Sequence, residues 1–70
     1  MLFRSAVALV RTLPPDQAEA VLLRVMVGME HAEIAAVMGK TPGAVRVLVH
    51  RGLRRLQQRL STQGERTVTP

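Results

Sequence analysis

Residues 28–60 read GMEHAEIAAVMGKTPGAVRVLVHRGLRRLQQRL, and they carry the strongest indication of the fold. It opens with a short alanine-rich segment between two glycines and passes through a Gly-Lys-Thr-Pro connection into a longer segment with five arginines and no acidic residue. Threonine is a good helix N-cap and proline a good first helical residue, so we expect a helix to start at Thr41–Pro42 and run to about Leu60. A short helix, a turn with glycine and a longer basic helix outline a helix-turn-helix.

Two more helices are predicted upstream of this pair. LFRSAVALVRTL predicts a first helix over about residues 2–12, which the two prolines at positions 14 and 15 end. Pro15 is suited to the first turn of a second helix, and Gly28 to its end. At helical spacing, the apolar face of this second helix should comprise Ala18, Leu22, Val25 and Met26.

The predicted organisation is therefore one all-α domain followed by a tail. We expect a four-helix domain over residues 1–60, with a C-terminal helix-turn-helix and no wing. Residues 61–70, STQGERTVTP, are polar and are expected to form a disordered tail.

Composition narrows the class of protein. The chain has 70 residues, 47% of them hydrophobic, which is enough for one small folded domain. Most of this content is Ala, Val, Leu and Met, with Phe3 the only aromatic residue, so close-packed helices are favoured over a sheet. Met26, Met29 and Met38 are interpreted as core residues. The absence of cysteine fits a cytoplasmic protein, and no apolar run approaches the roughly 20 residues of a membrane span, so we expect no membrane insertion.

The positive charge is confined to one segment. The whole chain carries a net charge of +5, yet residues 1–39 carry −1, residues 40–60 carry +6 and residues 61–70 are neutral. This is the distribution expected of an anion-binding element on a neutral scaffold.

Helical periodicity divides the last predicted helix into an inner and an outer face. The inner stripe, expected in the core, is Val45, Val49, Gly52, Leu53, Leu56 and Leu60, with Leu48 at its edge. A helix of this size is roughly 28 Å long, whereas the major groove of DNA is about 12 Å wide. Only the first two turns can therefore meet bases.

Two outer residues are the best candidates for base contacts. Arg46 and Arg51 carry guanidinium groups, which can bind O6 and N7 of guanine with two hydrogen bonds. Val47 is either a contact for a thymine methyl group or a tolerated exposed valine. His50 is interpreted as a groove or phosphate contact.

Other residues are expected to bind the phosphate backbone. Lys40, Thr41 and the free N–H groups of the helix start can hold phosphate, although Thr41 can equally be an N-cap alone. Arg54 and Arg55 lie further along and should approach the backbone, while Arg24 is expected to pair with a nearby carboxylate. The predicted DNA-binding residues are Lys40, Thr41, Gly43, Arg46, Val47, His50, Arg51, Arg54 and Arg55.

Residues 13–60 resemble region 4 of bacterial sigma factors, most closely the extracytoplasmic-function (ECF) group. The resemblance rests on an ordered series: Leu-Pro-Pro, then Val-Leu-Leu-Arg, then G-x-x-x-x-E-I-A-x-x-M-G, then Thr-Pro-Gly-Ala-Val-Arg and His-Arg. It implies a domain that recognises the −35 promoter element, contacts the flap of the RNA polymerase β subunit, and is often bound by an anti-sigma factor.

The chain also departs from the family pattern. The family's recognition helix commonly reads T-V-K-S-R-L-H-R-A, so Arg46 falls at a basic, base-reading position, and His50 and Arg51 match directly. Val47 and Leu48 replace a small polar and a basic residue, so no promoter sequence transfers. Glu30 replaces a serine-type cap, from which we expect a looser start of the third helix. Nothing resembles region 2, which binds the −10 element, so we expect the chain not to start transcription alone.

Three other kinds of protein share some of these sequence features. The effector domain of LuxR-type regulators also has four helices and a G-x-x-x-x-E-I-A helix, but the Leu-Pro-Pro start and the Val-Arg…His-Arg pattern favour a sigma factor. A protein-interaction module, with the basic face on an acidic partner, is a second alternative. A membrane-surface helix is disfavoured because the apolar stripe lacks aromatic anchors. We expect no enzyme, metal or cofactor, because His31 and His50 lie on different predicted helices without a nucleophile or ligand cluster.

Overall fold

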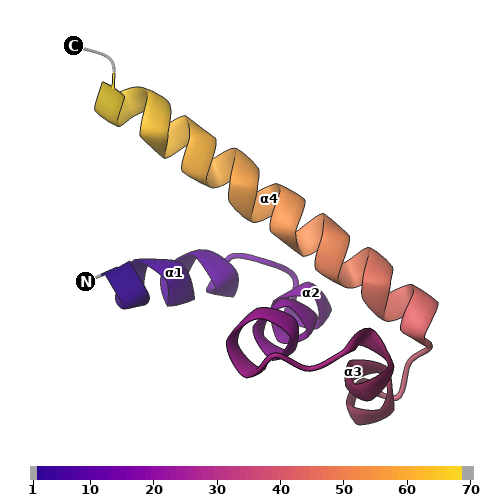
Figure 1. Ribbon diagram of the computed structural model, residues 1–70. Helices are drawn as coiled ribbons and strands as arrows, with labels where there is room; N and C mark the ends of the chain where they lie inside the picture. The colour runs from indigo at the N-terminus through magenta and orange to yellow at the C-terminus, as the bar shows by residue number, and fades with distance from the viewer. Residues whose placement is uncertain (1, 69–70) are drawn as a thin grey trace.

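A computed structural model describes the backbone of residues 2–68 and the side chains of residues 7–60. The helices are α1 (Leu2–Arg11), α2 (Pro15–Val21) with its continuation as the π-helix η1 (Leu22–Val27), α3 (His31–Met38) and α4 (Pro42–Val68). The other helices gather along one side of α4, with α3 beside its start, then α2, then α1 (Figure 1). Residues 2–68 contain no strand, and the predicted all-α fold with a C-terminal helix-turn-helix is confirmed.

Proline and glycine set the helix boundaries as predicted. Pro15 opens α2 after an extended Pro14, and the Ala18 N–H donates to the Pro14 carbonyl at 2.9 Å. Gly28 and Gly39 end η1 and α3 in the left-handed conformation, at φ 85° and 69°. A side chain would be strained there, whereas glycine adopts this conformation readily.

The core consists of two small apolar clusters along α4. The larger cluster joins α2, α3 and the first turns of α4 through Ala20, Ile34, Ala35, Val45 and Val49. The smaller cluster joins the end of α1 to α2 through Val10, Leu13 and Val21, with Leu56 of α4 packed against it. The core therefore fixes α4 by one face along its first half, which is the half predicted to meet DNA.

The apolar face predicted for the second helix is present, but three of its four residues are not buried; only Ala18 packs against the core. Leu22, Val25 and Met26 are exposed at 36%, 58% and 54%, whereas the buried residues are Gln17, Ala20 and Val21. The three exposed side chains do share one face, but this face borders a space between α1, η1 and α4 that no described side chain fills. Met29 and Met38 do pack against the core, but Met26 does not.

Leu22, Val25 and Met26 line an apolar groove between α1, η1 and α4. Its volume is about 270 Å³. Leu53 and Leu60, which we predicted to be buried, are 43% and 53% exposed and belong to it. The residues of this apolar groove are Val7, Leu9, Val10, Val21, Leu22, Val25, Met26, Leu53, Leu56 and Leu60.

Helix α4 continues to Val68, past its predicted end near Leu60. No proline interrupts residues 43–69, and the polar residues after Leu60 tolerate a helix even though Gly64 weakens it by about 1 kcal/mol. The backbone of residues 61–68 is thus helical, where a disordered tail was expected. Residues 69–70 and the side chains of 61–68 lie outside the described residues, and the division into a domain over 1–60 and a tail over 61–70 stays a prediction.

Candidate nucleic-acid interface

A tight connection places the start of α4 beside the end of α3. After Gly39, the Lys40 N–H donates to the carbonyl of Ala35 at 2.9 Å, which closes α3 and fixes the backbone of the turn. The hydroxyl of Thr41 then accepts a hydrogen bond from the Ala44 N–H at 3.1 Å, and its carbonyl accepts one from the Val45 N–H at 3.0 Å. Thr41 is therefore the N-cap of α4, as predicted.

The same cap leaves hydrogen-bonding capacity that faces solvent. Pro42 has no N–H and the Ala44 N–H is taken by Thr41, so Gly43 offers the remaining amide of the first turn. The Thr41 hydroxyl accepts in the cap and still has its own proton to donate. A Cβ atom placed at Gly43 would have no other residue's atom packed within 4 Å, so a ligand can approach this part of the backbone closely. The helix start is thus shaped to accept an anion.

One side of α4 faces the core and the other is exposed. Val45 and Val49 are 0% and 5% exposed, and Gly52 is buried with them. All nine predicted DNA-binding residues are exposed. The buried valines hold the helix by its inner face, so the basic face, meaning the exposed residues Arg46, Val47, His50, Arg51, Arg54 and Arg55, is presented outward.

Lys40 differs from the arginines of the basic face because it has an ion-pair partner, whereas none is found for them among the described residues. Its Nζ lies 3.2 Å from Oδ2 of Asp16, at the start of α2. The sequence does not predict this pair, because the residues are far apart along the chain and Asp16 is equally explained by the dipole of its own helix. The predicted phosphate ligand is therefore engaged within the protein.

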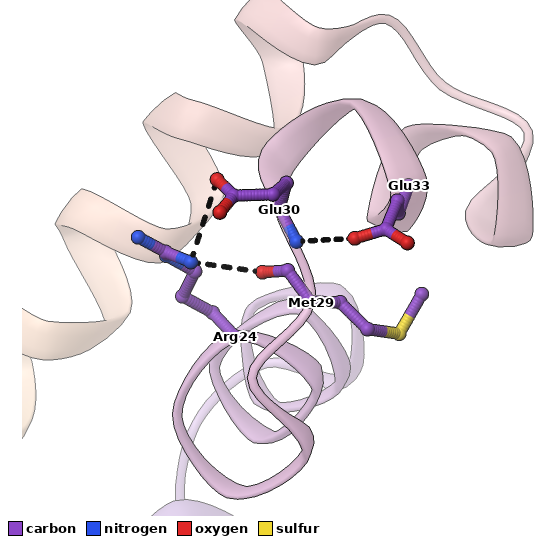
Figure 2. A network of polar contacts seen from close by, with 4 residues as sticks. All are labelled: Arg24, Met29, Glu30 and Glu33. Carbon is purple, nitrogen blue, oxygen red and sulfur yellow. Dashed lines mark hydrogen bonds and ion pairs between the residues drawn. The ribbon is translucent and has the colours of Figure 1, made fainter.

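A polar network fixes the start of α3 (Figure 2). Nη1 of Arg24 donates to the Met29 carbonyl at 3.0 Å and lies 3.8 Å from Oε1 of Glu30. The Glu33 carboxylate accepts a hydrogen bond from the Glu30 N–H at 2.9 Å, the return bond of a capping box. The predicted pairing of Arg24 with a carboxylate is confirmed. The expected looseness of this helix start is wrong, because the side chain of Glu30 accepts the N–H of Glu33 as a serine cap would, and Glu33 returns the bond to complete a capping box.

The described residues offer neither a metal cluster nor a membrane span. Among them, no three or more histidine, aspartate and glutamate side chains gather where they could hold a metal ion. No helix in the described part of the chain has both the length and the apolarity to cross a bilayer.

Comparison with known proteins connects this geometry to one family. The family model described as sigma-70, region 4, matches residues 3–56. The chain is 46% identical over 57 residues to the ECF RNA polymerase sigma factor SigD of Mycobacterium tuberculosis, covering 81% of this chain and 27% of that protein. It is 47% identical over 49 residues to the ECF RNA polymerase sigma factor ShbA of Streptomyces griseus, covering 70% of this chain and 26% of that protein.

A third ECF sigma factor matches the chain at a similar level of identity. The ECF RNA polymerase sigma factor BldN of Streptomyces coelicolor is 47% identical over 51 residues, covering 73% of this chain and 19% of that protein. The chain thus spans about a quarter or less of the length of these curated relatives. Of the two helix-turn-helix families compared from the sequence, these matches name the sigma factors.

Proposed function

The chain belongs to the region 4 family of sigma-70 factors, and from this premise we propose that it recognises a −35-type promoter element through the first two turns of α4. Region 4 is a DNA-binding module of a transcription initiation factor and not a catalytic one. The observation that carries the proposal is the exposed basic face on a helix whose opposite face is buried. We place the domain in the bacterial cytoplasm, where promoter DNA and polymerase are found.

The proposed roles follow from position along α4. Arg46 lies in the second turn of α4, and Arg51 lies in the third, from which its long side chain can point back toward the helix start; both read base edges. Lys40, Thr41 and the Gly43 amide bind phosphate at the helix start, and Arg54 and Arg55 bind it further along. Val47 is 46% exposed among these cations, consistent with an apolar contact to a thymine methyl group.

A selection from a randomised duplex library tests the function. The purified 70-residue chain is mixed with the library at modest salt, and the bound duplexes are sequenced. Enrichment of one short, non-palindromic motif is the expected result, because a single α4 reads one half-site. A palindromic motif would instead indicate a LuxR-like pair of domains, and binding without enrichment that vanishes as salt rises would mean that charge alone holds the DNA.

Two substitutions test the division of roles on the selected motif. Arg51→Ala should weaken the selected duplex by about 1–3 kcal/mol and relax the base preference. Lys40→Ala should weaken selected and scrambled duplexes alike, because a phosphate contact carries no sequence information. Equal losses on every sequence for both variants would contradict the roles given to these residues.

The apolar groove is the second functional surface that we propose. It receives an amphipathic segment of a protein partner, the polymerase β flap first and an anti-sigma factor in competition with it. The support is exposure: Leu22, Val25 and Met26 form an uncovered apolar patch, and such patches commonly mark protein interfaces. This surface is lined by η1 and α1 as well as α4, so it is separate from the basic face.

Charged substitutions distinguish the two surfaces. Val25→Glu and Met26→Glu place a charge in an already exposed position, so the fold should persist. Affinity for the isolated β flap, measured by calorimetry, should fall about tenfold or more, and duplex affinity should change little. Val47→Gln on the basic face is the matched control, since it should affect only DNA. Unchanged flap binding by both glutamate variants would exclude the apolar groove as the contact.

A further inference from the structure

The pair of Lys40 and Asp16 joins the helix-turn-helix to α2 by opposite charges. Lys40 is the only lysine of the chain and lies directly before the cap of α4. Its Nζ is 3.2 Å from Oδ2 of Asp16, and the two side chains are 32% and 60% exposed. A single acidic residue of the scaffold is thus held against a cation of the proposed DNA-binding surface.

The geometry allows the ammonium to move while the backbone stays fixed. The Lys40 N–H is held by the Ala35 carbonyl at 2.9 Å, and the next residue caps α4. The lysine side chain is a flexible four-carbon stem with a compact charge, so it can reorient without disturbing the turn. Lys40 can therefore face either Asp16 or a phosphate at the helix start.

We propose that Asp16 competes with DNA phosphate for Lys40 and so holds the DNA affinity of the domain below what its cations alone would give. This inference rests on the proposed DNA-binding function. A lysine that stays in a neutral pair with aspartate neutralises no phosphate and displaces no counterion from the DNA, whereas a free lysine displaces about one. When DNA binds, either Lys40 leaves Asp16, or the carboxylate stays beside the phosphate and repels it.

The exposure of the pair sets the size of the effect. Because both side chains are partly open to water, their attraction is screened and the cost of separating them is small. Releasing Lys40 should therefore raise DNA affinity by about two- to fivefold at low salt. A purely structural tether predicts the opposite sign, because breaking it would loosen the turn and lower affinity.

A double-mutant cycle on the 70-residue chain tests the competition. Affinity for a scrambled duplex is measured by fluorescence anisotropy over a range of KCl concentrations for Asp16→Asn, Lys40→Gln and the double variant. Glu19→Gln is the matched control, because Glu19 is an exposed acid on the same helix for which the described residues show no ion pair. We expect Asp16→Asn to raise affinity about two- to fivefold and to steepen the salt slope by about 0.9. When Lys40→Gln is already present, Asp16→Asn should raise duplex affinity no more than Glu19→Gln does alone.

Two results would overturn the inference. The first is a gain in duplex affinity from Asp16→Asn that equals the gain from Glu19→Gln, or that is the same with and without Lys40→Gln. Either would show that Asp16 acts only through the overall charge of the domain. The other is a loss of affinity in Asp16→Asn, which would show a structural tether. The scrambled duplex keeps this test separate from the proposed function: a wild-type chain that binds selected and scrambled duplexes alike fails as a promoter reader, and the cycle still reports on Lys40. A chain that binds no duplex at low salt would refute both.

Discussion

Gly52 lies where α4 meets α2, and the contact leaves no room for a side chain. A Cβ at this position would be 2.5 Å from Cγ2 of Val21 and 3.5 Å from Cδ1 of Leu13. Beside them, Oε1 of Gln17 is buried without a hydrogen-bond partner in the described part of the chain. The contact between α4 and α2 is thus close-packed around Gly52, and this contact sets the position of the basic face.

Replacing Gly52 should therefore destabilise the domain although glycine is a poor helix residue. Alanine would gain about 1 kcal/mol of helix propensity. The clash with Val21, which is 2% exposed and stiff because it is β-branched, should cost about 1–3 kcal/mol. We expect Gly52→Ala to lower the free energy of unfolding by about 1 kcal/mol net, as measured by urea denaturation.

Gly43→Ala is the control for this prediction. Gly43 lies in the same helix with nothing within 4 Å, so alanine there should raise stability by about 0.4–1 kcal/mol. If both alanine variants gained stability equally, the contact between α4 and α2 at Gly52 would be looser than the distance to Val21 indicates.

At the scale of elements, the sequence predicts best where local signals decide. Gly39, Thr41 and Pro42 act on the backbone next to them. Helix α4 is regular enough that steps of about 100° per residue place the seven candidate residues within it on the exposed side. The predictions that failed concern contacts between helices, which the periodicity of one helix cannot predict. Leu22, Val25 and Met26 are exposed because no described element covers them, and the Lys40–Asp16 pair depends on how separate helices come together. Exposure of Leu53 and Leu60 likewise depends on how far α1 and η1 cover α4.

The junction between η1 and α3 should depend more on a hydrogen bond than on an ion pair. The Arg24 guanidinium donates to the Met29 carbonyl at 3.0 Å, whereas its contact to Glu30 is 3.8 Å and the Glu30 side chain is 75% exposed. Arg24→Met keeps much of the apolar stem and removes the donor, so it should lower the free energy of unfolding by about 1 kcal/mol. Glu30→Gln should cost less than about 0.5 kcal/mol, because exposed ion pairs contribute little.

Thermal and urea unfolding of both variants measures this difference. Arg24→Lys is a useful third variant, because it retains the charge but loses the planar guanidinium. An equal loss for Arg24→Met and Glu30→Gln would mean that the ion pair, and not the carbonyl contact, holds the start of α3.

At the scale of the whole molecule, α4 serves two surfaces that do not overlap. Leu53 belongs to the apolar groove and Arg51 to the basic face, and residues two apart on a helix point about 200° from each other. The core lies between them along the inner side of the first half of α4. A protein partner in the apolar groove and DNA on the basic face can therefore be bound together, as the proposed function requires.

The salt dependence of DNA binding should report how much of α4 touches the duplex. Five cations are placed at DNA by the proposal, namely Lys40, Arg46, Arg51, Arg54 and Arg55. At about 0.9 per phosphate neutralised, the plot of log affinity against log salt should have a slope of about −4, less steep than five free cations would give because Asp16 offsets Lys40. Arg54→Gln should reduce this slope by about 0.9, as measured by fluorescence anisotropy at several KCl concentrations.

Arg59→Gln is the matched control, because it removes the same charge from an exposed position of the same helix. Arg59 is one turn beyond Arg55 and lies on the flank near the inner stripe, so a duplex that holds the first turns of α4 should not reach it. Its substitution should leave the slope unchanged and lower the affinity only slightly through the long-range field. If Arg59→Gln flattened the slope as much as Arg54→Gln, the duplex would lie along the length of α4 instead of at its start, and the roles given to Arg46 and Arg51 would lose their geometric basis.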